Sequence, residues 1–226
     1  AQPVSFVIEN ADWAIKRVGE SICNEIETFA PNQISISKKP AKLINKIVHF
    51  GSQYMWVNWG KYMSSNNIYV VSFFHGKPED GPDIKKHIDE FLASTLKLDK
   101  IIVSNSLVEK RLINWGVEKS KLVKIPIGVN TTLFKPTSKF QREETRKKLG
   151  FLKDEIVIGS FQKDGTGWKD GFEPKLIKGP DVFIDVLRKL KNKVKVSVLL
   201  TGPARGYVKK HLEEMKVKYK HVYLKK

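Results

Sequence analysis

The segment Ile125-Pro-Ile-Gly-Val-Asn-Thr-Thr-Leu-Phe-Lys-Pro136 separates two series of alternating strand-like and helix-like stretches. Pro126 and Pro136 have no amide hydrogen to donate, and Gly128 tolerates a positive φ. A Gly-Val-Asn turn between two prolines therefore continues neither a strand nor a helix. We interpret the segment as the crossing from one domain to the next. Ligands of α/β proteins commonly bind at such junctions, so we expect Gly128 and Asn130 to line a cleft.

The N-terminal side of this crossing alternates apolar strands with amphipathic helices. The stretch 68–74 is nearly all apolar, which is typical of a central parallel strand that is buried on both faces. We expect strands over 4–8, 33–37, 46–50, 68–74, 100–104 and 121–125, and helices over 13–29, 83–98 and 106–115. Strands that alternate with helices in this way form a parallel, doubly wound sheet.

The C-terminal side repeats the alternation in a shorter form. A charged helix is expected over 141–149 and is stopped by Gly150. After it we expect strands over 155–161, 195–200 and 221–224, and helices over 180–191 and 205–217. This is a βαβαβ unit, which is half of a typical α/β domain of about 150 residues. The sequence therefore predicts one α/β domain over 1–136, a linker with a helix over 137–153, and a partial second domain over 154–226.

Composition and charge exclude several classes of protein. A chain of 226 residues with 41% hydrophobic residues is not disordered. Its formal net charge of +17 lies mostly after residue 136, where 23 Lys and Arg face 11 Asp and Glu. Such a basic half can indicate nucleic acid, an anionic membrane, a phosphorylated ligand or ordinary solvated lysines. Lysine outnumbers arginine and no aromatic-interleaved basic motif is present, so specific recognition of nucleic acid is not expected.

The single cysteine, Cys23, leaves no disulfide framework and no thiolate metal site. It falls in the expected helix 13–29, and we interpret it as a small buried apolar residue in a protein of a reducing compartment. No apolar run approaches the roughly 20 residues that a membrane-spanning helix needs.

Polar residues and glycines follow the expected strands, where parallel sheets carry their binding sites. His75 is the most specific of them, because it directly follows the buried strand 68–74 and its ring should point into the site. The alternative is a ring that bonds to a loop carbonyl. We interpret the other histidines as structural or exposed, namely His49, His87, His211 and His221. The remaining candidates at strand ends are Asp12, Trp13, Gly76, Ser104, Asn105, Gly202 and Arg205.

A second specific feature is Lys178-Gly179-Pro180, at the start of the expected helix 180–191. Proline at the first helical position, preceded by glycine, leaves backbone amides free, and the helix dipole favours an anion there. Lys178 adds a positive charge, and Lys163 follows the preceding strand. We therefore expect Lys163, Lys178 and the amides near Gly179 to bind a diphosphate, the alternative being a solvated lysine beside an ordinary helix start.

The connection 162–177 is too long for a plain strand-to-helix loop of about 2 to 6 residues, so a lid or clamp is expected there. It contains no Gly-Lys-Ser/Thr and is not a P-loop. No Gly-x-Gly-x-x-Gly follows the first strand, which argues against a nicotinamide dehydrogenase. No Asp-x-Asp, histidine cluster or cysteine pair is present, so no metal site is expected.

Several of these segments, in this order, resemble the group 1 (family four) retaining glycosyltransferases, which have two Rossmann-like domains in the GT-B arrangement. The segments that carry the resemblance are Val103-Ser-Asn-Ser, Leu112-x-x-Trp-Gly-Val117, 123–136, Ile158-Gly-Ser-Phe, Lys178-Gly-Pro-Asp-Val-Phe-Ile-Asp-Val-Leu and Val198-Leu-Leu-Thr-Gly-Pro. The resemblance spans most of residues 68–206. It implies a GT-B-like fold, with an acceptor-side domain over 1–136 and the first half of a nucleotide-sugar domain over 154–226.

The resemblance also implies an activity and roles for the candidate residues. The activity is transfer of a sugar from a nucleotide-diphosphate sugar to a glycan, lipid or small-molecule acceptor, with retained configuration and with no cofactor or required metal. His75 would contact the donor sugar near the reacting carbon, while Lys163, Lys178 and Gly179 would bind the diphosphate. The acceptor side or cleft would hold Asp12, Trp13, Gly76, Ser104, Asn105, Gly128 and Asn130, and the nucleotide side Gly202 and Arg205.

The chain departs from this family at identifiable places. Asn130 stands where the family usually has Asp, and Lys163 stands near a usual Arg. The family's paired glutamates, which hold the donor, would follow Lys226. We therefore expect the donor domain to be incomplete in this chain and the fragment itself to be weakly active or inactive.

Two other functions remain open from the sequence. One is another GT-B enzyme, such as a sugar-nucleotide epimerase. The other is a non-catalytic module whose basic half binds an anionic partner. On the leading interpretation we expect a cytoplasmic protein with peripheral contact to a membrane surface.

Overall fold

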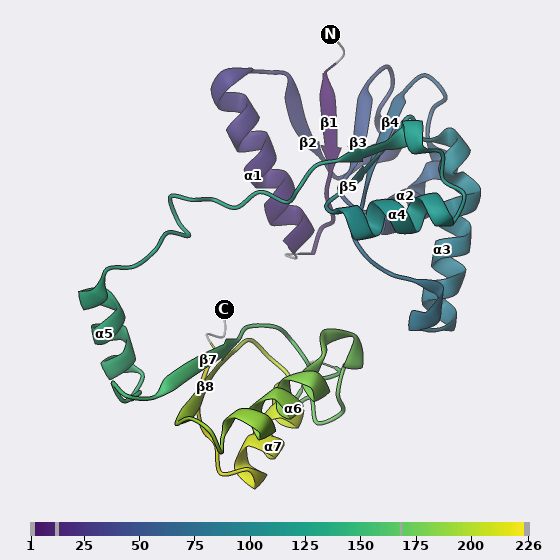
Figure 1. Ribbon diagram of the computed structural model, residues 1–226. Helices are drawn as coiled ribbons and strands as arrows, with labels where there is room; N and C mark the ends of the chain where they lie inside the picture. Colours follow the sequence, from purple (N-terminus) through teal and green to yellow (C-terminus); the bar gives the residue numbers. More distant parts are fainter. Residues whose placement is uncertain (1–2, 12–13, 168, 224–226) are drawn as a thin grey trace. The chain divides into compact units, whose positions relative to one another are not determined.

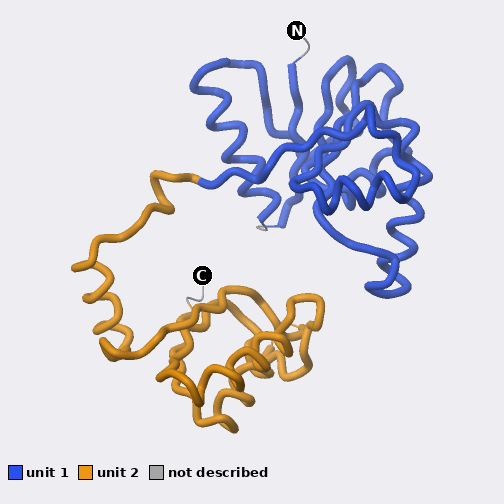
Figure 2. The backbone as a smooth tube through the Cα atoms, viewed as in Figure 1, with its two compact units in different colours: residues 1–129 blue, residues 130–226 orange. Residues whose placement is uncertain are grey.

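The computed structural model describes residues 3–11, 14–167 and 169–223. It divides into two compact units, Ala1–Val129 and Asn130–Lys226 (Figure 2). The division falls inside the proline-bounded segment that the sequence marks as a crossing. Each unit has its own sheet and its own apolar core.

Unit 1 is built on a six-stranded sheet in which every neighbouring pair is parallel, as the sequence predicts (Figure 1). The strand order is β2-β1-β3-β4-β5-β6. The strands are β1 (Val4–Val7), β2 (Ile34–Ser37), β3 (Ile47–Phe50), β4 (Ile68–Phe73), β5 (Lys100–Val103) and β6 (Leu122–Lys124). Because the strands run in one direction, all their carboxyl ends meet at the same edge of the sheet.

The helices of unit 1 connect consecutive strands and cover the sheet. They are α1 (Ala14–Phe29), α2 (Gln53–Trp59), α3 (Pro82–Ser94) and α4 (Ser106–Asn114). Phe6 and Ile8 form a small cluster with Cys23 of α1, which is buried as the sequence predicts. A Cβ on Gly19 would come within 2.7 Å of both Phe6 and Ile8, so α1 lies close to β1 because this position has no side chain.

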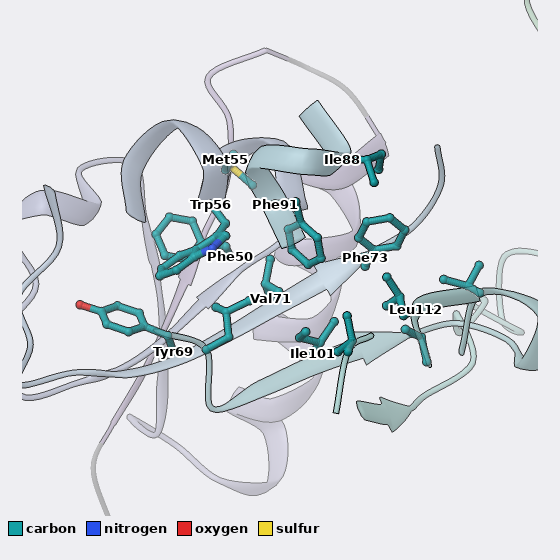
Figure 3. Close-up of a cluster of buried hydrophobic side chains, with 14 of the residues drawn as sticks. Phe50, Met55, Trp56, Tyr69, Val71, Phe73, Ile88, Phe91, Ile101 and Leu112 are labelled. Carbon is teal, nitrogen blue, oxygen red and sulfur yellow. The ribbon is translucent and has the colours of Figure 1, made fainter. Parts of the chain in front are cut away.

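The main core of unit 1 joins the central strands to α2, α3 and α4 (Figure 3). Alternate residues of β4 point into it, among them Val71 and Phe73, which are fully buried. Phe73 meets Phe91 of α3 with ring centroids 5.0 Å apart, and Trp56 of α2 meets Phe50 at 5.5 Å. The Trp56 indole donates a hydrogen bond to Ser94 Oγ at 2.8 Å, so the one polar atom of this large side chain has a partner.

His49 is a titratable group that is partly buried in the β-sheet of unit 1. Its Nε2 lies 2.9 Å from Ser72 Oγ on β4, and its ring centroid lies 4.5 Å from that of Phe6. Burial lowers the pKa of His49 to about 4, because the charged imidazolium would lose its hydration there. His49 is therefore neutral at neutral pH, in agreement with the structural role expected for it.

The sequence pattern predicts no element over 53–59, where the structure has α2. The local signal is the N-cap: Ser52 has extended backbone, and its side chain accepts a hydrogen bond from the Tyr54 amide at 3.1 Å. Gln53, Met55 and Trp56 are buried on one side of this helix. Seven residues hold too few turns for the apolar periodicity to be distinctive.

Unit 2 has a three-stranded parallel sheet in the order β7-β8-β9, and the helices over 180–190 and 206–214 pack against it (Figure 1). The strands are β7 (Ile156–Ser160), β8 (Val196–Thr201) and β9 (Lys218–Val222), and the helices are α5 (Lys139–Lys148), α6 (Pro180–Leu190) and α7 (Gly206–Glu214). The last strand begins at residue 218 rather than 221 because α7 ends at 214, earlier than the predicted 217. Within the expected linker 137–153, the structure has α5, and it belongs to unit 2.

The long connection between β7 and α6 is held against the start of α7 by backbone hydrogen bonds. The Gly165 amide donates to Ala204 O at 2.9 Å, and the Gly206 amide donates to Asp170 O at 2.6 Å. This approach requires glycine, because a Cβ on Gly165 would lie 2.4 Å from Gly171 O, and one on Gly171 would lie 2.5 Å from Ala204 O. We call residues 163–167 and 169–175 of this connection the clamp; Asp164, Gly165 and Gly171 are buried there, while most of its other described residues are exposed.

Candidate functional site

The carboxyl end of β4 in unit 1 carries His75, the residue singled out by the sequence. Its side chain is exposed, and Gly76 behind it is buried with a φ of 108°. Gln53 of α2 fixes the backbone here: its Nε2 donates to His75 O at 2.9 Å, and its Oε1 accepts from the Phe74 amide at 3.4 Å. The side chain of His75 is thus presented at the sheet edge on a backbone that α2 holds in place.

Two aromatic residues that the sequence did not select surround His75. The rings of Tyr54 on α2 and His87 on α3 are stacked, with centroids 3.9 Å apart, and the Tyr54 ring lies 6.2 Å from that of His75. Burial lowers the pKa of His87, Glu90 opposes this, and the positive charge of His75 adds to it. Burial, and after it the charge of Asp80, raises the pKa of Tyr54. The stack therefore remains uncharged at neutral pH and gives His75 an apolar neighbour.

Ser104 and Asn105, the two candidates that follow β5, make local hydrogen bonds. Asn105 is the N-cap of α4: its Oδ1 accepts from the Val108 amide at 3.0 Å, and its Nδ2 donates to Ser104 Oγ at 3.1 Å. Both residues lie at the same sheet edge as His75, because β5 is the parallel neighbour of β4. Asp12 and Trp13, expected on the acceptor side, lie outside the described residues.

The two candidates in the crossing segment belong to different units. Gly128 in unit 1 is exposed and does not use a positive φ. Asn130 in unit 2 is also exposed, and its Oδ1 accepts from the Thr132 and Leu133 amides at 3.0 Å each. Asn130 therefore closes a local turn, a role that aspartate can also fill.

In unit 2, the predicted diphosphate-binding residues lie around the carboxyl end of β7 and the start of α6. Gln162 Nε2 donates to Lys178 O at 2.5 Å, which holds the two segments together. Gly179 caps α6 in a left-handed conformation with a φ of 64°, and Pro180 is the first helical residue. Pro180 has no amide hydrogen and the Gly179 amide donates to Leu176 O, so the amides available to an anion before the first helical bond, from Phe183 to Gly179 O, are those of Asp181 and Val182.

A cluster of positive charge adjoins this helix start. Burial, and after it the charge of Lys175, lowers the pKa of Lys163. The ammonium groups of Lys163 and Lys175 are thus close enough to repel each other, and an anion between them would relieve the repulsion. Lys178 is exposed, its amide donates to Lys175 O at 2.8 Å, and its carbonyl accepts from Gln162, the neighbour of Lys163 in the sequence. Lys175 is a member of the cluster that the sequence interpretation did not include.

Arg205 and Asp164 form a buried ion pair under the clamp, with Arg205 Nη2 3.0 Å from Asp164 Oδ2 and both side chains at most 1% exposed. Arg205 also donates to Ser160 Oγ at 2.7 Å and to the carbonyl of Gln162. Burial raises the pKa of Asp164 although the charge of Arg205 opposes this. Arg205 was predicted on the nucleotide side, and its guanidinium instead joins the end of β7 to the clamp.

Gly202, the other candidate for the nucleotide side, follows β8 with a φ of 78°. Its carbonyl lies 2.7 Å from Nε2 of His221 on β9. His221 on β9 therefore has the structural role expected of it.

Comparison with solved structures gives matches along the whole chain. The Anabaena protein HepE, solved with UDP and glucose and also with UDP-glucose, superposes with a TM-score of 0.71 at 14% identity, over 100% of this chain and 70% of HepE. The lipopolysaccharide outer core galactosyltransferase WaaB superposes with a TM-score of 0.50 at 10% identity, over 99% of this chain and 68% of WaaB. The fold is GT-B-like. No family model and no curated protein matches the sequence.

The candidate residues therefore form two groups, one at a sheet edge in each unit. Strand order brings His75, Gly76, Ser104 and Asn105 together in unit 1. The hydrogen bond between Gln162 and Lys178 joins the second group in unit 2. Gln53 follows the strand 46–50 and lies among the strand-end residues that the sequence marks, whereas Tyr54 escaped prediction because the helix that carries it was not recognised, although Ser52 is a usual N-cap residue.

Proposed function

We propose that this protein is an enzyme that transfers a sugar from a nucleotide-diphosphate sugar to an acceptor, with retention of configuration. The observation that carries the proposal is the cluster of Lys163, Lys175 and Lys178 beside the free amides of α6, in a GT-B-like fold. HepE, the match with a TM-score of 0.71, was solved with UDP-glucose. The resemblance to group 1 glycosyltransferases supports retention and a glycan, lipid or small-molecule acceptor.

The chemistry that the proposal asks of unit 2 is stabilisation of a leaving diphosphate. Negative charge on the diphosphate increases as the bond to the sugar breaks, and fixed positive groups lower the energy of that state more than that of the bound donor. Lys163 and Lys178 supply ammonium groups and α6 supplies amide donors and its dipole. These groups need no metal ion for this step in the proposal, so activity is expected to persist in a chelator.

In this proposal His75 of unit 1 contacts the donor sugar. Gln53 holds the backbone of His75 and the Tyr54–His87 stack limits the space beside its ring. We further propose that the enzyme works in the cytoplasm, where the buried Cys23 remains a thiol.

The first experiment measures binding rather than turnover, because binding can be measured without knowing the acceptor. Isothermal titration with UDP and with uridine separates recognition of the diphosphate from recognition of the nucleoside. We expect Lys178→Gln to weaken UDP about tenfold or more, since a charge-assisted hydrogen bond contributes about 1.5 to 3 kcal/mol. Lys189→Gln, an exposed lysine in the last turn of the same helix, is the matched control and should leave binding unchanged.

A panel of UDP, GDP, ADP and CDP sugars extends the test to the nucleotide. If Lys178→Gln and Lys189→Gln bind every diphosphate equally well, the lysine cluster is not a donor site. If wild-type protein binds none of them and transfers no sugar from any of them, the glycosyltransferase proposal is wrong. Donor turnover without acceptor would instead support the epimerase alternative.

A further inference from the structure

The edge of the unit 2 sheet opposite the diphosphate candidates concentrates positive charge. Because β7, β8 and β9 are parallel, the three segments that lead into them reach this one edge. Segments 146–155, 188–195 and 215–218 together contain eleven Lys and Arg but only two Asp and Glu. We call these eleven residues the basic edge: Arg146, Lys147, Lys148, Lys153, Arg188, Lys189, Lys191, Lys193, Lys195, Lys216 and Lys218.

The two acidic residues of these segments already have partners. Asp154 accepts from Lys195 at 2.9 Å. Glu155 is buried, and it accepts from Ser197 Oγ at 2.7 Å and lies 3.4 Å from Lys218 Nζ. Neither carboxylate neutralises the other cations. Six lysines of the basic edge are exposed, and their ammonium groups have no hydrogen-bond or ion-pair partner among the described residues, namely Lys147, Lys148, Lys153, Lys189, Lys193 and Lys216.

The basic edge also has a hollow and exposed apolar side chains. The hollow, of about 310 Å³, lies between the segments that precede β8 and β9 and is lined by Lys191, Lys195 and Lys216. Val194 lines it as well and is 37% exposed, and Leu152 near the start of β7 is 51% exposed. Ammonium groups around a hollow of this size fit an anionic headgroup, while the two apolar side chains fit the interfacial layer beneath it.

The composition of the basic edge favours lipid over nucleic acid or an acidic protein. Nine of its eleven cations are lysine, whereas nucleic-acid recognition relies on arginine and on exposed aromatic rings. The aromatic residue in these segments, Phe151, is 6% exposed and lies under Lys218. Protein interfaces likewise need large anchors such as Trp or Tyr at their centre. We propose that the basic edge binds this protein to the surface of a bilayer that contains anionic lipids.

Sedimentation with lipid vesicles tests the proposal on the intact chain. We expect binding to vesicles of equal parts phosphatidylcholine and phosphatidylglycerol, none to phosphatidylcholine alone, and release as salt rises. Each lysine near an anionic surface strengthens binding roughly fivefold, so Lys153→Gln, Lys193→Gln and Lys216→Gln combined should weaken it roughly a hundredfold. These lysines are exposed and unpaired, so the variant should keep the unfolding midpoint of the wild type.

A matched control removes the same charge from unit 1. Lys86→Gln, Lys110→Gln and Lys119→Gln change three exposed lysines that have no partner among the described residues. Loss of vesicle binding in the first triple variant but not in this one supports the basic edge. Equal loss in both, equal binding to neutral vesicles, or retention by duplex DNA without any binding to anionic vesicles overturns the proposal. None of these lysines is a donor-site candidate, so this outcome is independent of the nucleotide titration.

Discussion

His49 gives a stability test with a calculable size. Its pKa is about 4 in the folded protein and 6.5 in the unfolded chain. Since the folded pKa is the lower one, the unfolded chain takes up a proton first as the pH falls. The contribution of neutral His49 to stability is therefore complete above the unfolded pKa and is lost as the pH falls toward the folded one. Between about pH 7 and about pH 5 the free energy of unfolding should fall by about 2 kcal/mol from this residue.

The variant His49→Gln isolates the contribution of His49 to the pH dependence of stability. Glutamine keeps an amide that can bond to Ser72 Oγ but cannot take up the proton, so the difference in stability between wild type and variant should shrink by about 2 kcal/mol over that pH range. All other titrating groups are common to both proteins and cancel in the difference. A constant difference across the range would show that His49 is accessible to water in the folded state.

Tryptophan fluorescence in urea is a suitable assay because four of the five tryptophans precede residue 130 and report on unit 1. The two units have separate cores, so the transition of unit 1 must be fitted by itself rather than as part of one two-state curve. Far-ultraviolet circular dichroism at each pH checks that the starting state is folded.

Three further substitutions test the supports of the two sheet edges. Gly165→Ala should destabilise unit 2 by about 1 to 3 kcal/mol in chemical unfolding because its Cβ would overlap backbone atoms; Gly128→Ala, with open space around it, is the control, and equal stabilities would argue against the clamp. Arg205→Met should destabilise unit 2 by about 3 to 5 kcal/mol by leaving a buried carboxylate unpaired, and adding Asp164→Leu should restore most of the loss; purely additive effects would contradict the pairing. Gln53→Ala should lower the stability of unit 1 by about 1 to 3 kcal/mol because a buried backbone amide loses its acceptor, and an unchanged midpoint in urea would mean that α2 does not hold the His75 backbone.

The parallel sheets could be predicted because their strands are apolar and bounded by turn residues. Buried strands such as β4 repeat β-branched and aromatic residues, which makes both the element and its burial recognisable. The start of α6 was equally accessible, since Gly179 and Pro180 occupy the positions that their backbone geometry favours. In these places local preference and tertiary structure agree.

Other features of the candidate site could not be predicted, mainly because they depend on contacts between residues that are distant in the sequence. The partnership of Asp164 with Arg205 joins positions 41 apart in the sequence, and nothing near either residue specifies it. Lys175 joins the lysine cluster because the clamp folds back, with its amide donating to Asp164 O. Tyr54 lies on a helix of seven residues, which is too short for a periodic signal.

The glycine-packed clamp has a consequence for exchanging parts between related proteins. The clamp and residues 204–206 contact each other through backbone atoms, and each contributes glycines where the other approaches. Suppose that only the clamp is replaced by the corresponding segment of a relative. Side chains in place of its glycines would then bring Cβ atoms against Ala204, or the Gly206 amide would lose its acceptor, Asp170 O. The two segments must therefore be exchanged together, although about 30 residues and a full helix separate them in the chain. Laboratory recombination should place its breakpoints outside both.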